Sequence, residues 1–437
     1  MKITRKIAQI DTTSKMTVAF DISKGKVNYY IQAVGKLAGN SCREEQIIEG
    51  CIPNRTNALI VELNKLQTLS REHGYTDGLH IVCEPTGSYS NSLMRLARKM
   101  GHTTAYVSGE SVAKARVIES NNDSKDDDVD PRIIYMLSKM GKELRYRDLP
   151  PEYRRLRRLN HLYDDVDTQR TRCKCELHAL LVQIFCDFPM CKDFVYSVSG
   201  ANLMDKYGFS PYRIVADSFT DFRTKMREKQ PKIPEKTLDK LYTAAQWSAK
   251  HCLPPEELEA LELQIKYVWD DYVRADSRKR DLRTQFGESY QRLWDAGEQV
   301  PQADGKHLNA VFIAQLVGET GPLSDFPNWE TLFKFCGLNL RKRESGMYKG
   351  KLKFAKRGRT PTRRILGKGA FHAVLTGQTY GDYYHERKEK DPSVSGTKLM
   401  ANVERKMLKL IFSAGRRREA FDEKRLTACE SVYRKAA

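Results

Sequence analysis

Four carboxylates in the first third of the chain are placed so that they could hold divalent cations. Asp21 and Glu84 each end a short apolar run of the kind that forms a buried strand. Asp127 and Asp130 lie three residues apart, where an acidic stretch enters a helical pattern. Acids at two strand ends and at the start of a helix can converge on one point, but like charges at close range repel unless cations lie between them. The pattern therefore predicts a metal site.

The ligand type indicates which metal and which reaction. Carboxylate oxygens suit Mg²⁺ or Mn²⁺. Two such ions about 4 Å apart stabilise both the attacking and the leaving oxygen of a phosphodiester displacement. We therefore predict metal-dependent DNA or RNA phosphodiester chemistry, with Asp21, Glu84, Asp127 and Asp130 as catalytic and metal-binding residues.

A second group of residues suited to phosphate chemistry lies near the other end of the chain. Residues 341–364 contain eleven Lys or Arg residues and one acid, Glu344. Flexible basic loops neutralise phosphates and hold a nucleic-acid backbone without reading its bases. The predicted nucleic-acid contacts are Lys125, Arg341, Lys342, Arg343, Lys349, Lys351, Lys353, Lys356, Arg357, Arg359, Arg363 and Arg364.

Ser345 lies at the centre of this basic stretch and is followed by Gly346. Ser-Gly is a common turn pair, so a purely structural role is one interpretation. The other is a nucleophile, because a serine hydroxyl can be activated by a base, a metal or surrounding positive charge. The neighbouring cations could then stabilise the charge that builds on the attacked phosphate. The residues alone leave both interpretations open.

Composition indicates the class of partner. A chain of 437 residues can form two or three domains with their own cores. Its net charge of +19 favours a polyanionic partner such as nucleic acid, although a basic protein with no specific partner is an alternative. With no long apolar run, neither secretion nor a membrane span is expected. Ten cysteines without a repeated spacing predict reduced thiols in the cytoplasm.

The elements that must position the four acids alternate between strands and helices over residues 1–148. This order predicts a mixed sheet flanked by helices, an α/β domain. Strands are expected at 17–21, 27–34, 80–83 and 103–108, and helices at 56–72, 90–100, 112–118 and 127–140.

Residues 149–300 change character after a Pro-Pro boundary. Apolar residues recur at spacings of three and four over 156–184 and again over 258–286, interrupted only by Arg170 and Lys279. Two matching heptad runs predict a coiled-coil arm, formed either as an antiparallel hairpin within one chain or as a contact between two chains. Two helices of an ordinary bundle would give the same pattern. A small helical insertion with a basic surface is expected at 187–254.

The last region, 301–437, is predicted to be a small all-α domain that carries the basic stretch as a loop. A first helix over 309–316 is expected to stop at Gly318, because glycine weakens a helix interior. The remaining helices are expected at 329–335, 362–376 and 398–414.

These motifs together resemble DEDD-type transposases of bacterial insertion sequences, the group that includes the pilin-gene invertase and the bridge-RNA-guided recombinases. The resemblance implies a RuvC-like nuclease fold for the first domain, a D-E-D-D set at Asp21, Glu84, Asp127 and Asp130, and a nucleophilic role for Ser345. It rests on residues 20–24, 83–89 and 124–130 near one end, and on 326–327, 335–338, 344–346, 356–358 and 363–366 near the other.

The sequence departs from the family pattern in several places. Pro131 follows Asp130 where the family usually has alanine, and the middle region is longer than is usual for the family. Asp126 stands where the family usually has threonine, so Asp123 and Asp126 stay open as alternatives to Asp127 for the third acid. The stretch 304–308 lacks the second glycine of a Pro-Gly-x-Gly hairpin that usually opens the C-terminal domain.

The resulting hypothesis is a cytoplasmic, nucleoid-associated bacterial transposase or recombinase that moves a DNA element. It implies Mg²⁺ (or Mn²⁺), double-stranded DNA ends and targets, a structured guide RNA, and dimers or tetramers. One alternative is a metal-dependent, junction-resolvase-like nuclease that uses water as its nucleophile. The other is a non-catalytic basic protein that only binds nucleic acid.

Overall fold

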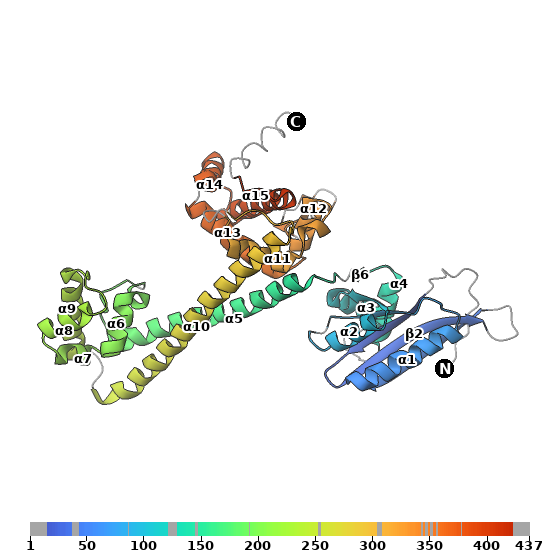
Figure 1. The fold of residues 1–437 in the computed structure, drawn as a ribbon, viewed down its shortest axis with the longest axis horizontal. Helices are drawn as coiled ribbons and strands as arrows, with labels where there is room; N and C mark the ends of the chain where they lie inside the picture. The colour runs from blue at the N-terminus through green and yellow to red at the C-terminus, as the bar shows by residue number, and fades with distance from the viewer. Residues whose placement is uncertain are drawn as a thin grey trace. The chain divides into compact units, whose positions relative to one another are not determined.

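The protein forms two compact units, Met1–Asp148 and Leu149–Ala437, which are described separately here (Figure 1). The computed structural model describes residues 15–36, 43–85, 87–120, 129–144, 147–191, 193–251, 255–303, 308–341, 344–345, 348–349, 353–354, 357–376 and 378–422.

The first unit is built on a six-stranded mixed sheet, as predicted. The strand order is β3-β2-β1-β4-β5-β6. β1 runs parallel to β4, and β4 parallel to β5, whereas the other neighbours are antiparallel. The strands are β1 (Met16–Ile22), β2 (Lys26–Lys36), β3 (Arg43–Pro53), β4 (Leu79–Cys83), β5 (Thr103–Val107) and β6 (Glu143–Leu144).

Helices cover both faces of this sheet. On one face, Phe20 and Ile81 pack against Leu63 of α1 (Thr56–Glu72), next to α2 (Asn91–Lys99). On the other face, Ala19 and Val82 pack against Ile133 and other residues of α3 (Gly109–Ser120) and α4 (Asp130–Lys139). Successive side chains of a strand point to opposite faces. Asp21, two residues after Ala19, therefore shares the α3 and α4 face.

In the second unit, the arm is an antiparallel hairpin within one chain. It consists of α5 (Pro151–Ile184) and α10 (Pro255–Asp295). Arg155 near the start of α5 donates to Ser289, whereas Arg170 further along donates to Asp276, so residue numbers rise on one helix as they fall on the other. The two polar breaks in the heptad runs are thus explained, because Arg170 pairs with Asp276 and Lys279 with Asp167.

The insertion between the arm helices is helical. It packs on the half of the arm that is formed by the end of α5 and the start of α10. Its core joins Phe222, Leu238 and Leu241 to Leu177 and Ile265 of the arm. Its elements are the 3₁₀ turn η1 (Phe194–Tyr196) and the helices α6 (Val198–Tyr207), α7 (Pro211–Ala216), α8 (Phe219–Arg227) and α9 (Glu235–His251).

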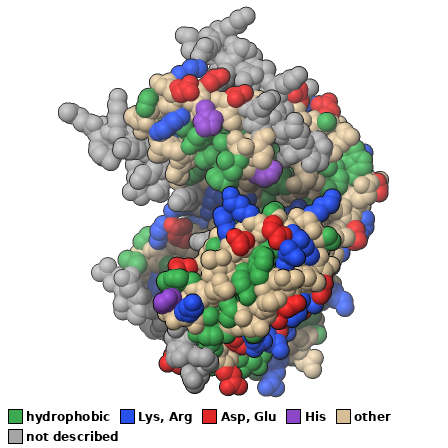
Figure 2. Space-filling view, turned by 90° about the vertical axis from the view of Figure 1, so that its left-hand side faces the viewer, with side chains coloured by type: hydrophobic (Ala, Val, Ile, Leu, Met, Phe, Trp, Pro, Cys, Tyr) green, Lys and Arg blue, Asp and Glu red, His purple; other side chains and the backbone are tan. Residues whose placement is uncertain are grey.

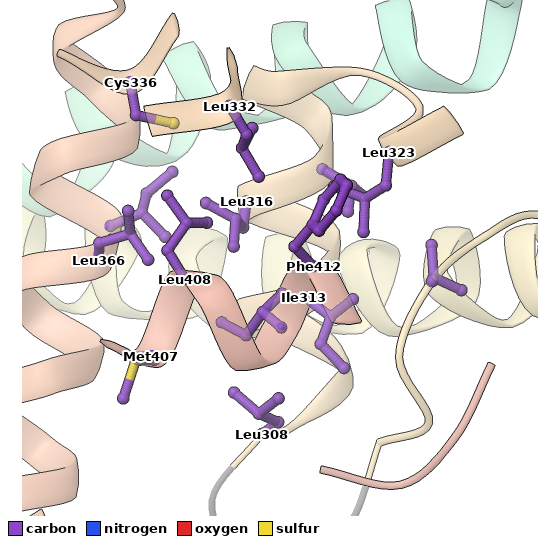
Figure 3. Close-up of a cluster of buried hydrophobic side chains, with 14 of the residues drawn as sticks. Leu308, Ile313, Leu316, Leu323, Leu332, Cys336, Leu366, Met407, Leu408 and Phe412 are labelled. Carbon is purple, nitrogen blue, oxygen red and sulfur yellow. The ribbon is translucent and has the colours of Figure 1, made fainter. Parts of the chain in front are cut away.

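The C-terminal region has its own apolar core, in which helices distant in sequence meet (Figure 3). Leu316, Leu332, Leu366 and Leu408 come from four different helices and are all fully buried. The elements are α11 (Ala310–Thr320), η2 (Leu323–Asp325), α12 (Trp329–Cys336), β7 (Leu340–Arg341), β8 (Glu344–Ser345), β9 (Tyr348–Lys349), β10 (Lys353–Phe354), α13 (Thr360–Thr376), α14 (Gln378–Lys390) and α15 (Gly396–Arg417).

The expected end of the helix at 309–316 is wrong. α11 continues through Gly318 to Thr320 instead of stopping at the glycine. A Cβ atom at position 318 would lie 2.8 Å from the Cβ of Leu156, so the glycine allows α11 to cross α5 closely.

The expectation that all thiols are reduced is wrong at Cys186, which forms a disulfide, while every other cysteine in the described part of the chain is free.

In the described residues, no helix is long and apolar enough to cross a membrane.

Candidate active site

The register of β1 and β4 brings Asp21 and Glu84 to neighbouring strand ends. In this parallel pair, Phe20 lies opposite Cys83, and Asp21 and Glu84 are the next residues on each strand. Both acids are partly buried. Burial, followed by the charges of Asp21 and Glu84, raises the pKa of the Cys83 thiol, so this thiol lies in the field of both carboxylates. The two acids therefore form one acidic site at the carboxyl edge of the sheet.

Gly109 makes room for the Glu84 carboxylate. It is the first residue of α3, and a Cβ atom there would lie 2.5 Å from Oε1 of Glu84. The carboxylate thus lies against the start of a helix, where the helix dipole favours negative charge. Sequence reasoning missed Gly109, although a glycine directly after the expected strand 103–108 is a signal of close approach at a strand end.

Asp130 is buried and held by Arg116. The side chain of Asp130 is 3% exposed, and its two oxygens accept from Arg116 at 2.7 Å and 3.0 Å (Oδ1) and at 2.7 Å (Oδ2). This bidentate pair joins the first residue of α4 to α3, on the face of the sheet that also carries Asp21. Arg116 was not found from the sequence, because its partner lies fourteen residues away across a stretch with no helical periodicity.

The remaining candidates of the acidic stretch, Asp123, Lys125, Asp126 and Asp127, lie outside the described residues. Among the described residues, no three His, Cys, Asp or Glu side chains lie close enough together to hold a metal ion. The structure thus brings Asp21 and Glu84 together and leaves Asp130 paired with Arg116. Two half-buried carboxylates side by side are a donor set that suits Mg²⁺ or Mn²⁺.

Ser345 lies in the short strand β8, where it pairs with Tyr348 of β9. The flanking β7 and β10 pair in the same antiparallel way, through Arg341 and Lys353. The basic stretch is therefore partly a pair of short ribbons and not wholly a loop. Lys342, Arg343, Lys351 and Lys356 lie outside the described residues.

Three of the other predicted phosphate contacts, Arg359, Arg363 and Arg364, have partners within the protein. Arg359 pairs with Glu319, whose side chain is almost fully buried and also accepts from Asn160 of α5 at 3.1 Å. Arg363 donates to the carbonyl oxygen of Cys336 at 3.0 Å. Arg364 pairs with Asp164 of α5. Arg359 and Arg363 thus make contacts within the C-terminal region, and Arg364 joins that region to α5 of the arm.

Arg357 is exposed, in contrast to Arg359 two residues later. Replacing Arg359 with Ala is expected to lower the free energy of unfolding by about 3 kcal/mol, because Glu319 would remain buried without its charged partner. Arg357→Ala should leave stability within about 0.5 kcal/mol and lower the slope of log K against log salt for DNA binding by about one. Urea unfolding and binding titrations measure the two effects. An Arg359→Ala protein as stable as the parent would contradict this division of roles.

Comparison with known families adds to this geometry. A family model for transposases of the DEDD, IS110 type matches residues 38–186, a span that contains Glu84, Asp127 and Asp130. A model for the transposase IS116/IS110/IS902 family matches residues 308–385, which contain Ser345 and the basic stretch. No curated protein matches the chain significantly.

The two matches together cover slightly more than half of the 437 residues and leave out Asp21 and the whole of 187–307. The DEDD transposase domain is RuvC-like, in agreement with the six-stranded mixed sheet. Both models describe the same kind of enzyme, and the spans that they match contain Glu84, Asp127, Asp130 and Ser345. The chain is therefore a DNA transposase of the IS110 type.

Proposed function

We propose that this transposase cuts and rejoins double-stranded DNA at the ends and target of a mobile element, with a divalent-metal site in its first unit and Ser345 as nucleophile. The parallel register that sets Asp21 beside Glu84 carries the proposal. It gives two partly buried carboxylates at one sheet edge, in a domain that the DEDD family model matches from residue 38 onward, Glu84 included.

Asp21 and Glu84 would hold Mg²⁺ or Mn²⁺, and Asp127 and Asp130 would complete the set. A bound ion would neutralise charge on the scissile phosphate and on the oxygens that enter and leave. The protein keeps the ligands in place by its own packing. Gly109 leaves space for the Glu84 carboxylate, and Arg116 fixes Asp130 at the start of α4.

The second part of the proposal is a covalent step at Ser345. Its Oγ attacks a DNA phosphorus atom and loses its proton, one P–O bond of the DNA breaks, and the displaced DNA oxygen leaves as a hydroxyl. Attack by a DNA hydroxyl on the phosphoserine then restores a phosphodiester and frees the serine, so no ATP is consumed. The match over 308–385 and the density of cations around Ser345 support this step.

The test is a search for a covalent protein–DNA adduct. Purified protein with Mg²⁺, element-end DNA and RNA from the element's flanks should form an adduct that protease treatment removes. Ser345→Ala should form none, whereas Ser393→Ala, which changes an exposed serine before α15, should behave like the parent. Cleavage by parent and Ser345→Ala alike without any adduct would instead support the water-using nuclease.

We also propose that the enzyme acts as a dimer or tetramer and uses a structured guide RNA, in the bacterial cytoplasm next to the nucleoid. Exposed apolar side chains on the arm support an assembly. Leu162 and Val182 on α5 are 51% and 68% exposed, and Leu263 and Val273 on α10 are 47% and 43% exposed. Mass measurements with and without RNA would test both points, and a monomer under all conditions would contradict the assembly.

A further inference from the structure

The solvent-facing side of α9 carries a continuous basic and aromatic stripe. Residues spaced three and four apart lie on one side of a helix. The opposite side of α9 is buried through Leu238, Leu241 and Ala245. The stripe consists of Lys236, Lys240, Thr243, Trp247, Lys250 and His251, all of them exposed.

The lysines of this stripe differ from most other cations of the insertion. Six of those cations have acidic partners, whereas the exposed Lys232, just before α9, is paired with no acid in the described part of the chain. Lys and Arg side chains are interspersed with Asp and Glu side chains on the side of the molecule seen in Figure 2. The pairs are Lys206–Glu228, Arg213–Glu262, Arg223–Glu235, Lys225–Asp217, Arg227–Glu235 and Lys229–Asp205.

Within the part of the chain that the structure describes, Lys236, Lys240 and Lys250 form no ion pair. Two acids lie next to the stripe along the helix. Glu235, one residue before Lys236, pairs with Arg223 and Arg227, and Asp239, three residues after Lys236 and one before Lys240, forms no ion pair with either lysine in the described part of the chain. A row of cations without partner acids on a solvent-facing helix leaves its charge available to an external polyanion.

Trp247 adds a surface for stacking. Its side chain is 48% exposed, and its ring centroid lies 4.6 Å from that of His251. An exposed indole among lysines can stack on a nucleobase while the ammonium groups neutralise phosphates. Only an unpaired base offers its face to such a ring. From Lys236 to Lys250 the stripe is about 21 Å long, enough for several nucleotides.

We propose that the α9 stripe binds an unpaired nucleic-acid strand, with its phosphates on Lys236, Lys240 and Lys250 and a base stacked on Trp247. The stripe lies in the region 187–307, which neither transposase model matches. This site goes beyond the proposed cutting and rejoining of DNA and does not depend on the metal site or on Ser345.

The first measurement is binding of the full chain to labelled 12-nucleotide single strands over a range of salt concentrations. Lys236→Gln/Lys240→Gln should lower the slope of log K against log salt by about 1.4, at about 0.7 for each lost phosphate contact. The control Lys206→Gln/Lys229→Gln removes the same charge from the same insertion, but from lysines that already have acidic partners, and should leave the slope unchanged. Equal slopes for both double variants would overturn the proposal.

The second measurement tests stacking. Trp247→Ala should weaken single-strand binding about tenfold, whereas Trp247→Phe, which keeps a ring, should retain most of the affinity. Single strands containing 5-iodouracil should photocrosslink to Trp247, which peptide mass spectrometry would detect. Crosslinks confined to residues 341–364, or an equal loss of duplex binding in Trp247→Ala, would overturn the proposal. RNA and DNA strands of the same sequence identify which of the two is the preferred ligand.

Discussion

Asp21→Asn or Glu84→Gln is expected to reduce Mg²⁺-dependent DNA cleavage by a factor of about a thousand or more while the fold is kept. Each change removes one anionic ligand from the sheet edge, and loss of metal-assisted charge stabilisation is worth several kcal/mol in the transition state, at about tenfold in rate for each 1.4 kcal/mol. The amide has nearly the volume of the carboxylate, so the packing of β1 on β4 is preserved. Single-turnover cleavage rates and thermal melts measure the two effects.

The matched control for this experiment is Asp77→Asn. Asp77 is exposed and lies just before the start of β4, at the opposite end of the strand from Glu84. The Asp77→Asn protein should cleave DNA at the parental rate. Full cleavage by Asp21→Asn or Glu84→Gln would show that the metal site has been assigned to the wrong residues.

Arg116→Gln is expected to destabilise the packing of α3 on α4 by about 3 kcal/mol in the absence of divalent metal. The substitution leaves the buried Asp130 carboxylate without a cation, and breaking a buried ion pair by removing one partner costs about 3 to 5 kcal/mol. If Asp130 is a metal ligand, Mg²⁺ should restore part of that stability by supplying the missing charge. Hydrogen exchange of the α3 and α4 amides, in EDTA and in Mg²⁺, measures both effects in the full chain.

The control is Lys114→Gln on the same helix. Lys114 pairs with Glu110 at the surface, with the two side chains 62% and 52% exposed, and such pairs contribute at most about 1 kcal/mol. Its exchange rates should match those of the parent with and without metal. If Mg²⁺ restores none of the loss in Arg116→Gln, Asp130 is a structural residue and not a ligand.

Much of the framework could be predicted from local pattern. The helix 56–72 has the bounds of α1, and the apolar runs before Asp21 and Glu84 are the parallel strands β1 and β4. These features depend on periodicity and on strand-end polarity, which a few neighbouring residues specify. The strand β3 was missed because it pairs with β2 alone, and its apolar residues, Ile47, Ile48, Cys51 and Ile52, follow no strict alternation in the sequence.

The partners of charged residues could not be predicted in the same way. Arg170 and Lys279 interrupt the heptads in sequence, but each meets an acid more than a hundred residues away. Arg357 and Arg359 look equivalent in a count of cations, yet Arg359 lies against the buried Glu319. A sequence gives the charge of a side chain, whereas its partner is fixed by tertiary packing, and that packing decides whether the charge is available to DNA.

The hairpin arm has a consequence for how the chain is made. α5 is complete at residue 184, but α10 ends only at residue 295. The apolar side of α5 therefore has no complete partner helix until residues 185–295 have been synthesised. At about 5 to 20 residues per second this takes roughly 5 to 20 s. The insertion is made first and covers Leu177 and Ile184 at the far end of α5. On the ribosome, we therefore expect the arm to close from the insertion toward the start of α5, with the insertion covering apolar side chains of α5 before α10 is complete.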